Sequence, residues 1–323
     1  MSAATRPPVV VVGAGLVGRG WAVVFARAGH EVRLVDTDPA VLTRVPAELA
    51  VMWAQVEDRP LPETVTTTTD LAAAVADAVH VQECVLEDPA LKARVLGAVD
   101  AAAPAGAVIA SSTSALVPSS FTAELPGRHR VLVAHPFNPP HLHTAVELVP
   151  APWTDPAAVT ATRALLEQAG MDPIELTHEV DGFVANRLQS ALIHEAFRLL
   201  AEGVVGPGDL DRAVRGALAP RWLTLGVVGT IDLNAPGGLA DYVQRYEAMY
   251  QRLAERQSDT VDWRAALDAG LLERVEAQLP RADLEARRAW RDAGLAALAR
   301  FREEDARRRP WPPTDDGEAL STS

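Results

Sequence analysis

A histidine that begins a proline-rich segment is the residue of this sequence best suited to proton transfer. His135 opens His135-Pro-Phe-Asn-Pro-Pro140 and follows apolar residues that predict a buried strand. Oxidation of an alcohol to a carbonyl requires removal of the hydroxyl proton, and histidine has an unperturbed pKa of about 6.5, close to the working pH. His135 is therefore the candidate general base.

Three more polar side chains fall where they could assist His135. Glu147 comes twelve residues later, where the chain could return as the adjacent strand, and its carboxylate would fix the imidazole tautomer and stabilise the charged ring. Ser114 ends a serine-rich segment that either binds a substrate oxygen or is an ordinary turn. Asn186, on a mostly apolar helical segment, requires a hydrogen-bond partner if buried, which is either the protein or a substrate.

A glycine-rich turn near the N-terminus predicts a dinucleotide cofactor, because it follows a β-branched run and opens a helical pattern. Gly13 permits the tight turn, Gly15 lets a pyrophosphate approach the backbone, and Gly18 lets the helix pack closely on the strand. The first helical residues, Leu16 and Val17, would direct free N–H groups at the phosphates.

Asp36 distinguishes between the two nicotinamide dinucleotides. It lies eighteen residues after Gly18, at the end of the second predicted strand, and no arginine follows it immediately. A carboxylate there accepts hydrogen bonds from a ribose 2′-hydroxyl and repels a 2′-phosphate. We therefore expect NAD rather than NADP.

The composition excludes several classes of protein. A net charge of −13 opposes binding to nucleic acid, which depends on clustered Lys and Arg. No apolar stretch approaches the roughly 18 residues that cross a bilayer, so no membrane association is expected. Cys84 is the single cysteine, which excludes an intramolecular disulfide and a multi-cysteine zinc site and favours a cytoplasmic location. Lys92 is the single lysine, so a Schiff-base mechanism would have one amine to use.

The first 180 residues alternate between strand and helix patterns, which predicts an α/β, Rossmann-type, doubly wound and mostly parallel sheet. Ligands bind at the carboxyl ends of the strands in such sheets, which is where His135 would lie. Strands are expected at residues 9–12, 32–35, 79–81, 108–110, 130–134 and 145–149, helices at 16–28, 71–76 and 91–102, and a further strand and helix within 156–177.

After residue 180 the periodicity becomes helical, and the 323 residues are long enough for a second domain. We expect an NAD-binding domain at 1–180, an all-helical domain at 181–309 and a disordered tail at 310–323. In the helix at 183–200 apolar residues extend beyond one stripe, which predicts burial on most faces.

Together, these motifs resemble the 3-hydroxyacyl-CoA dehydrogenase superfamily, and most closely its lambda-crystallin or L-gulonate 3-dehydrogenase branch. The resemblance implies a Rossmann domain followed by a helical domain that closes over a small hydroxy acid and forms a homodimer. The matching segments are His80-Val-Gln-Glu-Cys84, Ser111-Ser-Thr-Ser114, His135-Pro-Phe-Asn-Pro-Pro140, Val146-Glu-Leu-Val-Pro150, Gly182-Phe-Val-Ala-Asn-Arg-Leu188, Asp209-Leu-Asp211, Asp232-Leu-Asn-Ala235 and Ala286-Arg-Arg-Ala-Trp-Arg-Asp292.

The resemblance also implies a reaction and the roles of four residues in it. NAD oxidises a 3-hydroxy acid to the 3-keto acid, with His135 as the general base and Glu147 as its orienting partner. Ser114 and Asn186 bind the reacting oxygen.

Four further residues receive binding roles from the same resemblance. Glu87 and Lys92 fall where the family contacts the cofactor, and Asn138 lies beside the nicotinamide. Arg221 falls where the branch has an arginine suited to a substrate carboxylate, which a guanidinium can bind in bidentate fashion.

The sequence departs from the branch at places close to the expected substrate. The segment between the second strand and His80 is shorter and has no lysine, so the arm that helps to bind CoA is reduced and a free acid is favoured. Leu225-Gly-Val-Val-Gly229 replaces the usual Ile-Gly-Pro, and His141-Leu-His143 replaces aromatic or aliphatic residues. These changes leave open L-gulonate itself, a 3-hydroxyacyl-CoA and a carnitine-type substrate.

Three other classes compete with a metal-free dehydrogenase. The residues His141, His143 and Glu147 would suit a metal-dependent dehydrogenase. A Ser114, His135 and Glu147 hydrolase lacks the G-x-S-x-G elbow before the serine. A non-enzymatic protein is the third class, since lambda-crystallin is a family member recruited for a structural role. The intact set of candidate catalytic residues favours an enzyme that needs no metal.

Overall fold

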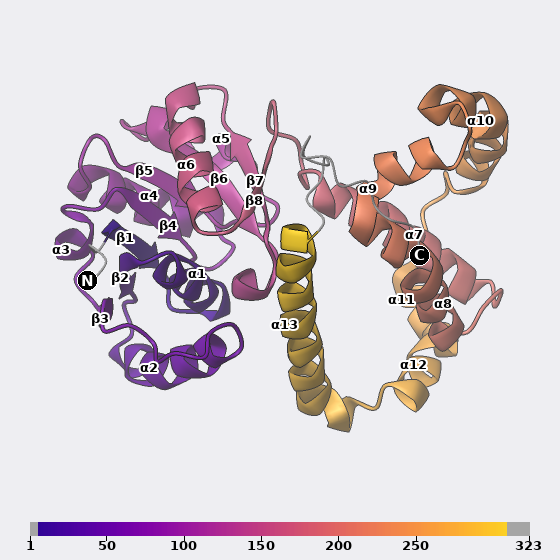
Figure 1. The fold of residues 1–323 in the computed structure, drawn as a ribbon, viewed down its shortest axis with the longest axis horizontal. Coiled ribbons are helices and arrows are strands. Elements are labelled where there is room, and N and C mark those ends of the chain that lie inside the picture. The colour runs from indigo at the N-terminus through magenta and orange to yellow at the C-terminus, as the bar shows by residue number, and fades with distance from the viewer. Residues whose placement is uncertain (1–5, 309–323) are drawn as a thin grey trace. The chain divides into compact units, whose positions relative to one another are not determined.

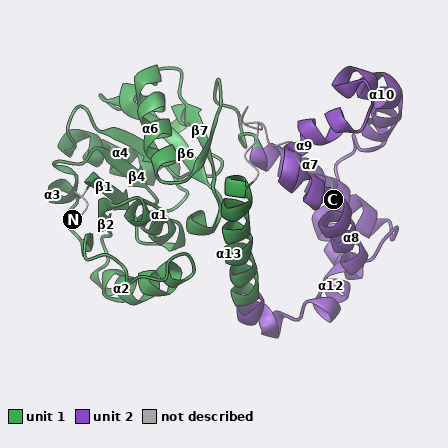
Figure 2. Ribbon diagram, in the orientation of Figure 1, with its two compact units in different colours: residues 1–184, 288–323 green, residues 185–287 purple. Residues whose placement is uncertain are grey.

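The chain divides into two compact units in the computed structural model, which describes residues 6–308. One unit consists of residues 6–184 together with 288–308, and the other of residues 185–287 (Figures 1 and 2). The tail expected at 310–323 lies outside the described residues. Within residues 6–308, no helix combines the length and the apolar character that a membrane span requires.

The first unit is built around an eight-stranded sheet with the strand order β3-β2-β1-β4-β5-β6-β7-β8. Among these described strands, every neighbouring pair is parallel except β6 and β7. The predicted Rossmann-type, mostly parallel sheet is therefore confirmed. The strands are β1 (Arg6–Val12), β2 (His30–Val35), β3 (Val65–Thr68), β4 (His80–Glu83), β5 (Val108–Ser111), β6 (Val131–Pro136), β7 (Ala145–Pro150) and β8 (Asp172–Glu175).

Alternate residues of the central strand β1 belong to two separate cores, because successive side chains of a strand point to opposite faces. Val9 and Val11 share one core with α1, α2 and α6, whereas Val10 and Val12 share the other with α3, α4 and α5. The helices are α1 (Leu16–Arg27), α2 (Pro39–Ala54), α3 (Leu71–Val75), α4 (Pro89–Ala102), α5 (Ser119–Thr122) and α6 (Pro156–Gln168).

The second unit is helical, and its first helix departs from the sequence prediction. Leu200 is buried in α7, but Leu188 is 63% exposed and Leu192 is 40% exposed. Burial of this helix on most faces is therefore a wrong prediction, because within the described chain only the C-terminal half of the apolar stripe is covered, where Phe197 stacks on Trp263. The helices are α7 (Ala185–Ala201), α8 (Pro207–Ala213), α9 (Ala219–Leu233), α10 (Gly238–Arg256), α11 (Trp263–Ala266) and α12 (Leu272–Gln278), and α13 (Leu284–Arg308) continues into the first unit.

Candidate active site

A buried histidine and carboxylate pair lies where β6 ends. The antiparallel pairing of β6 with β7 sets His135 opposite Glu147, and Nδ1 of His135 lies 2.8 Å from Oε2 of Glu147. The other carboxylate oxygen accepts a hydrogen bond of 2.8 Å from the backbone N–H of Val184. Because Glu147 is fully buried and acceptor-only when ionised, it holds the proton of the imidazole on Nδ1 and leaves the lone pair on Nε2.

Two phenylalanine rings flank this imidazole. The ring centroids of Phe137 and Phe183 lie 5.1 and 5.5 Å from that of His135. Phe183 is fully buried and adopts a φ of 51°, a left-handed conformation that is costly for a bulky residue and is typical of functional sites. The rings keep water from one side of the base, a role that the sequence analysis missed although Phe183 stands in a quoted motif.

The glycine turn between β1 and α1 has the geometry of a phosphate-binding loop. Gly13 has a φ of 106°, and a Cβ there would lie 2.7 Å from the carbonyl oxygen of Cys84. A Cβ on Gly18 would collide with the carbonyl of Gly13, so helix and strand approach closely. A Cβ on Gly15 would meet nothing within 4 Å, which leaves space for a ligand at the helix N-terminus, beside the half-exposed Leu16.

Asp36 stands at the end of β2 and closes the same loop. Its Oδ2 accepts a hydrogen bond of 2.9 Å from the backbone N–H of Ala14, and its Oδ1 accepts one of 3.0 Å from Asp38. The carboxylate is therefore fixed beside the glycine turn, in the position that binds a ribose hydroxyl in dinucleotide folds.

Glu87 and Lys92 form one network with the Ser114 loop. Oε1 of Glu87 accepts hydrogen bonds from the Ser114 backbone at 2.9 Å and from Oγ1 of Thr113 at 2.5 Å. Nζ of Lys92, which is 1% exposed, lies 3.3 Å from Oε2 of Glu87 and 3.0 Å from Oε1 of Glu83. Burial opposes the charge of Glu87, but these hydrogen bonds and the Lys92 charge outweigh burial and lower its pKa. The sequence analysis missed Glu83.

The proline-rich segment after His135 is held against α1. Asn138 is exposed, whereas Pro140 is buried and lies so close to Gly20 that a Cβ there would come within 2.5 Å of the proline ring. His141 is also buried, with Nε2 2.6 Å from Oε1 of Gln55. Burial lowers the pKa of His141 to about 4. Nε2 is thus engaged by Gln55, and within residues 6–308 no group of three or more His, Cys, Asp or Glu side chains is placed to hold a metal ion.

Two family models match the chain in succession. The NAD binding domain of 3-hydroxyacyl-CoA dehydrogenase matches residues 8–180, and the C-terminal domain of the same family matches residues 182–277. The chain belongs to the 3-hydroxyacyl-CoA dehydrogenase family. It is thus an NAD-dependent oxidoreductase, and the predicted family, cofactor and enzyme class are confirmed.

Similar proteins support the assignment of this chain to the lambda-crystallin branch of the family. The chain is 38% identical over 309 residues to a lambda-crystallin homolog of Bos taurus, covering 92% of this chain and 96% of the relative. It is 38% identical over 244 residues to an L-carnitine dehydrogenase of Streptomyces griseus, covering 74% and 73%. A solved 5-formyl-3-hydroxy-2-methylpyridine 4-carboxylic acid 5-dehydrogenase, described as an NAD+ dependent dismutase, matches with a TM-score of 0.79 at 26% identity, covering 92% of this chain and 98% of that one.

Two predicted site residues of this dehydrogenase lie in the helical unit. Asn186 is in the first turn of α7, and Arg221 is in α9. The guanidinium of Arg221 is exposed and donates from Nε to the carbonyl of Ala217 at 3.0 Å. Their positions on these helices are fixed by the structure, and their roles toward a substrate stay predictions.

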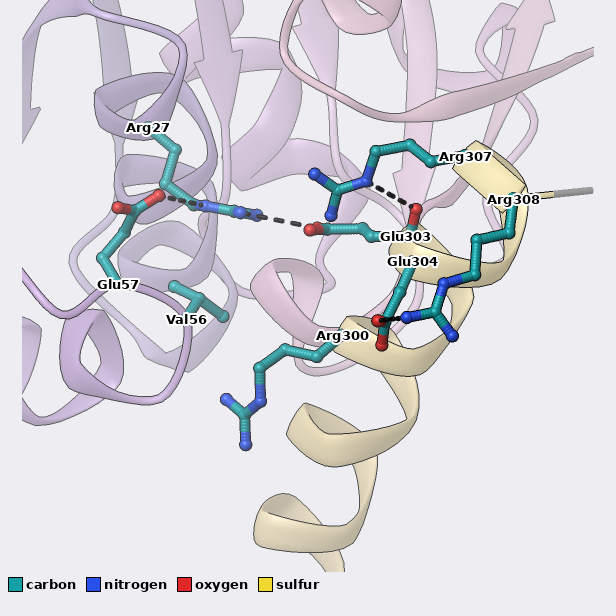
Figure 3. A pocket seen from close by; sticks show the side chains of 8 residues that line it. All are labelled: Arg27, Val56, Glu57, Arg300, Glu303, Glu304, Arg307 and Arg308. Carbon is teal, nitrogen blue, oxygen red and sulfur yellow. Dashed lines mark hydrogen bonds and ion pairs between the residues drawn. The ribbon is translucent and has the colours of Figure 1, made fainter. Parts of the chain in front are cut away.

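A pocket of about 650 Å³ in the sheet unit of this dehydrogenase contains none of the predicted site residues. Figure 3 shows that its charged side chains largely pair with one another, as Arg27 does with Glu57 at 3.1 Å. Its four arginines and three glutamates leave a net charge of +1, most of it paired within the lining, and the pocket does not compete with His135 as the active site. Its lining consists of Arg27, Val56, Glu57, Arg300, Glu303, Glu304, Arg307 and Arg308.

Proposed function

We propose that this protein oxidises a 3-hydroxy acid to the 3-keto acid with NAD, as an L-gulonate 3-dehydrogenase does. The observation that carries the proposal is the buried pair of His135 and Glu147, joined at 2.8 Å at the end of β6. A base held in one tautomer at this edge of the sheet is what alcohol oxidation requires.

In the proposed mechanism, Nε2 of His135 takes the proton of the substrate hydroxyl. Glu147 receives the Nδ1 hydrogen bond throughout and stabilises the imidazolium that forms. Ser114 and Asn186 donate hydrogen bonds to the reacting oxygen, in the roles that the family resemblance assigns to them. The Ser114 hydroxyl, which lies 3.3 Å from Oε1 of Glu87 in the structure, rotates to the substrate in this step. The rings of Phe137 and Phe183 exclude water on one side of the base.

The residues of the sheet unit account for the cofactor. When bound, NAD supplies the hydride acceptor. Gly13, Gly15 and Gly18 shape the loop for the pyrophosphate, the N–H groups of Leu16 and Val17 face it, and Asp36 binds the ribose hydroxyl. By resemblance, the nicotinamide half is bound by Glu87, Lys92 and Asn138.

The substrate is a free hydroxy acid in this proposal, with its carboxylate on Arg221. Supporting this choice, the chain between β2 and β4 contains no lysine, and its two arginines, Arg44 and Arg59, already pair with Glu48 and Glu57. The second candidate is oxidation of a carnitine-type or 3-hydroxyacyl-CoA substrate, which the 38% identity to an L-carnitine dehydrogenase favours.

We propose that the active form is a cytoplasmic homodimer. Apolar side chains are exposed along three helices of the second unit, which is the surface that a second copy would cover. A single half-buried cysteine, Cys84, agrees with a reducing compartment. The exposed apolar residues of these helices include Leu188 and Leu192 of α7, Leu223, Val227, Val228 and Leu233 of α9, and Leu239, Val243, Met249, Tyr250 and Leu253 of α10.

A panel of substrates tests the proposal. L-gulonate, L-carnitine, 3-hydroxybutyrate and a 3-hydroxyacyl-CoA are each mixed with NAD, and NADH formation is followed by absorbance. We expect the highest kcat/KM with a free sugar acid. A higher kcat/KM with carnitine or the CoA thioester would favour the second candidate, and no turnover of any member would refute the dehydrogenase.

A further inference from the structure

A carboxylate that the proposed mechanism does not use is buried at the end of β4. Glu83 is fully buried, and its two oxygens lie 3.0 and 3.2 Å from Nζ of Lys92. Its carboxylate also accepts hydrogen bonds from the hydroxyl of Ser111, its register partner on β5, and from the backbone N–H of Val85 at 2.6 Å. Glu83 therefore joins two strand ends and the loop that follows β4, neighbours in the sheet of Figure 1.

The ammonium of Lys92 connects this carboxylate to a second one. Lys92 projects from the first turn of α4, is 1% exposed, and lies 3.3 Å from Oε2 of Glu87 as well as 3.0 Å from Glu83. Its remaining contact is the carbonyl of Val85 at 3.3 Å. All three hydrogens of the ammonium thus have protein oxygens to bind, so its position is set by the pair of glutamates.

Glu87 in turn binds the loop that carries Ser114. Its Oε1 accepts hydrogen bonds from the backbone N–H groups of Ser114 at 2.9 Å and Ala115 at 3.3 Å, and from Oγ1 of Thr113 at 2.5 Å. The hydroxyl of Ser114 is a fourth donor to the same oxygen, at 3.3 Å. Four donors on one oxygen make the loop follow the position of the Glu87 carboxylate. The chain of contacts from Glu83 to the Ser114 backbone is therefore continuous.

We propose that Glu83 is a positioning residue that sets the place of Ser114 through Lys92 and Glu87. The inference rests on the proposed function in one respect, the role of Ser114 in binding the reacting oxygen. Stability alone is a poor explanation of the Glu83 and Lys92 pair, because buried ion pairs can often be replaced by uncharged side chains without loss. A charged pair is explained better if its ammonium group must hold a second carboxylate, Glu87, in place beside the binding loop.

Glu83→Gln is the test, since the amide keeps the size of the side chain and removes its charge. Lys92 then has Glu87 as its only anionic partner, so the ammonium closes on Glu87 and draws Oε1 away from the loop. We expect amide exchange at Ser114 and Ala115, followed by NMR or mass spectrometry, to become at least about tenfold faster. Exchange at the wild-type rate would overturn the proposal.

Asp100→Asn is the matched control, because Asp100 forms another buried ion pair in the same unit, 2.8 Å from Arg130. Loss of the ion pair between Asp100 and Arg130 should destabilise the sheet unit without changing the contacts of the Ser114 loop. Exchange at Ser114 and Ala115 should stay close to the wild-type rate. An equal acceleration in Asp100→Asn would show a general loss of stability and would refute positioning by Glu83.

The kinetic readout connects the network to the reaction. In Glu83→Gln, kcat should fall about 10- to 100-fold from a misplacement of the Ser114 loop. NAD affinity should weaken as well, because Lys92 and Glu87 bind the nicotinamide half in the proposed function. The pH profile of kcat should keep its wild-type shape, because His135 and Glu147 are unchanged. An unchanged kcat would contradict the proposal. An inactive wild type would instead refute the proposed function, and the exchange measurement would still decide the role of Glu83.

A double variant covers the case in which Glu83→Gln does not fold. Glu83→Gln with Lys92→Met removes both buried charges, so the melting temperature should return toward that of the wild type. Of the contacts described above, Glu87 then keeps those to the loop alone and loses its link to α4. The carboxylate and the loop can then move together, and we expect fast exchange at Ser114 and Ala115 despite the recovered stability. Wild-type exchange in the double variant would show that the pair is structural only.

Discussion

The two units of this chain bury their side chains to very different extents. In the sheet unit, the strands and their covering helices close two cores, one on each face of the sheet. In the helical unit, the buried apolar cluster is small and consists of Leu200, Ala266 and Leu271, while apolar residues along α7, α9 and α10 are exposed. The sheet unit therefore completes its own core, whereas the helical unit exposes apolar surface, which a second copy would cover in the proposed homodimer.

The buried ionisable side chains are also distributed unequally between the two units. Within the described chain, those below one-tenth exposure lie in the sheet unit, and they include the His135 and Glu147 pair and the Glu83 and Lys92 pair. Charges are buried only where partners are fixed, which requires a closed core. The sheet unit is therefore the one whose buried ionisable groups can carry out proton transfer.

The largest expected effect comes from removing the proposed general base, His135, from the sheet unit. His135→Ala should lower turnover about 10²- to 10⁴-fold, because proton transfer from the substrate hydroxyl loses its acceptor. NAD affinity should remain near the wild-type value, since the glycine loop and Asp36 are unchanged. The measurements are steady-state kinetics and a fluorescence titration with NAD.

The control for this variant is His178→Ala, at an exposed histidine of the same unit. It should retain wild-type turnover. Wild-type turnover in His135→Ala would mean that the reaction needs no base at this position.

A buried histidine predicts that the sheet unit weakens in acid. His80 is 1% exposed, and burial lowers its pKa from 6.5 to about 4. Between pH 6.5 and 4, His80 binds a proton in the unfolded chain but stays neutral in the folded chain. The contribution of His80 to the free energy of unfolding is therefore complete above pH 6.5 and is lost as the pH falls toward 4. The loss amounts to roughly 3 kcal/mol.

Urea unfolding at several pH values measures this effect. The loss of unfolding free energy in acid should be smaller in His80→Gln than in the wild type, whereas His178→Gln should keep the wild-type dependence. If the free energy of unfolding depended on pH in the same way in all three proteins, His80 would not be the cause of the loss of stability in acid.

The exposed face of α7 gives the smallest of these predicted effects. Leu188→Glu places a charge on a side chain that is 63% exposed in the single chain and that we expect a second copy to cover. The dimer dissociation constant should rise about tenfold or more, as expected for loss of one buried leucine. Sedimentation velocity over a range of concentrations measures it.

Val51→Glu is the matched control, because Val51 is 66% exposed on α2 of the sheet unit. It should leave the dissociation constant unchanged. Equal sedimentation of Leu188→Glu and the wild type at every concentration would show that no copy covers α7.

The sequence predicted most of the sheet because its strands alternate between two faces that the same unit covers. It missed α2 although Leu42, Val45 and Leu49 recur at helical spacing, because Pro46 interrupts that pattern. It missed β3 because Val65–Thr68 has one apolar residue and is only partly buried. Burial of α7 was wrong because periodicity marks an apolar face and does not say what covers it.

The candidate site shows the same limit at the level of single residues. The spacing of His135 and Glu147 sufficed to suggest a pair, since adjacent antiparallel strands set them opposite one another. Glu83 was missed because its partners come from β5 and α4, and their meeting depends on strand register and helix placement. Asn186 and Arg221 carry no sequence signal of the substrate atoms that they would bind.

The most direct test of the central claim follows the hydride itself. The wild-type protein is mixed with NAD and a 3-hydroxy acid that carries deuterium on C3, and the NADH formed is examined by mass spectrometry. The account predicts NADH that contains one deuterium, together with the 3-keto acid. NADH without deuterium, or no NADH with any 3-hydroxy acid, would contradict it.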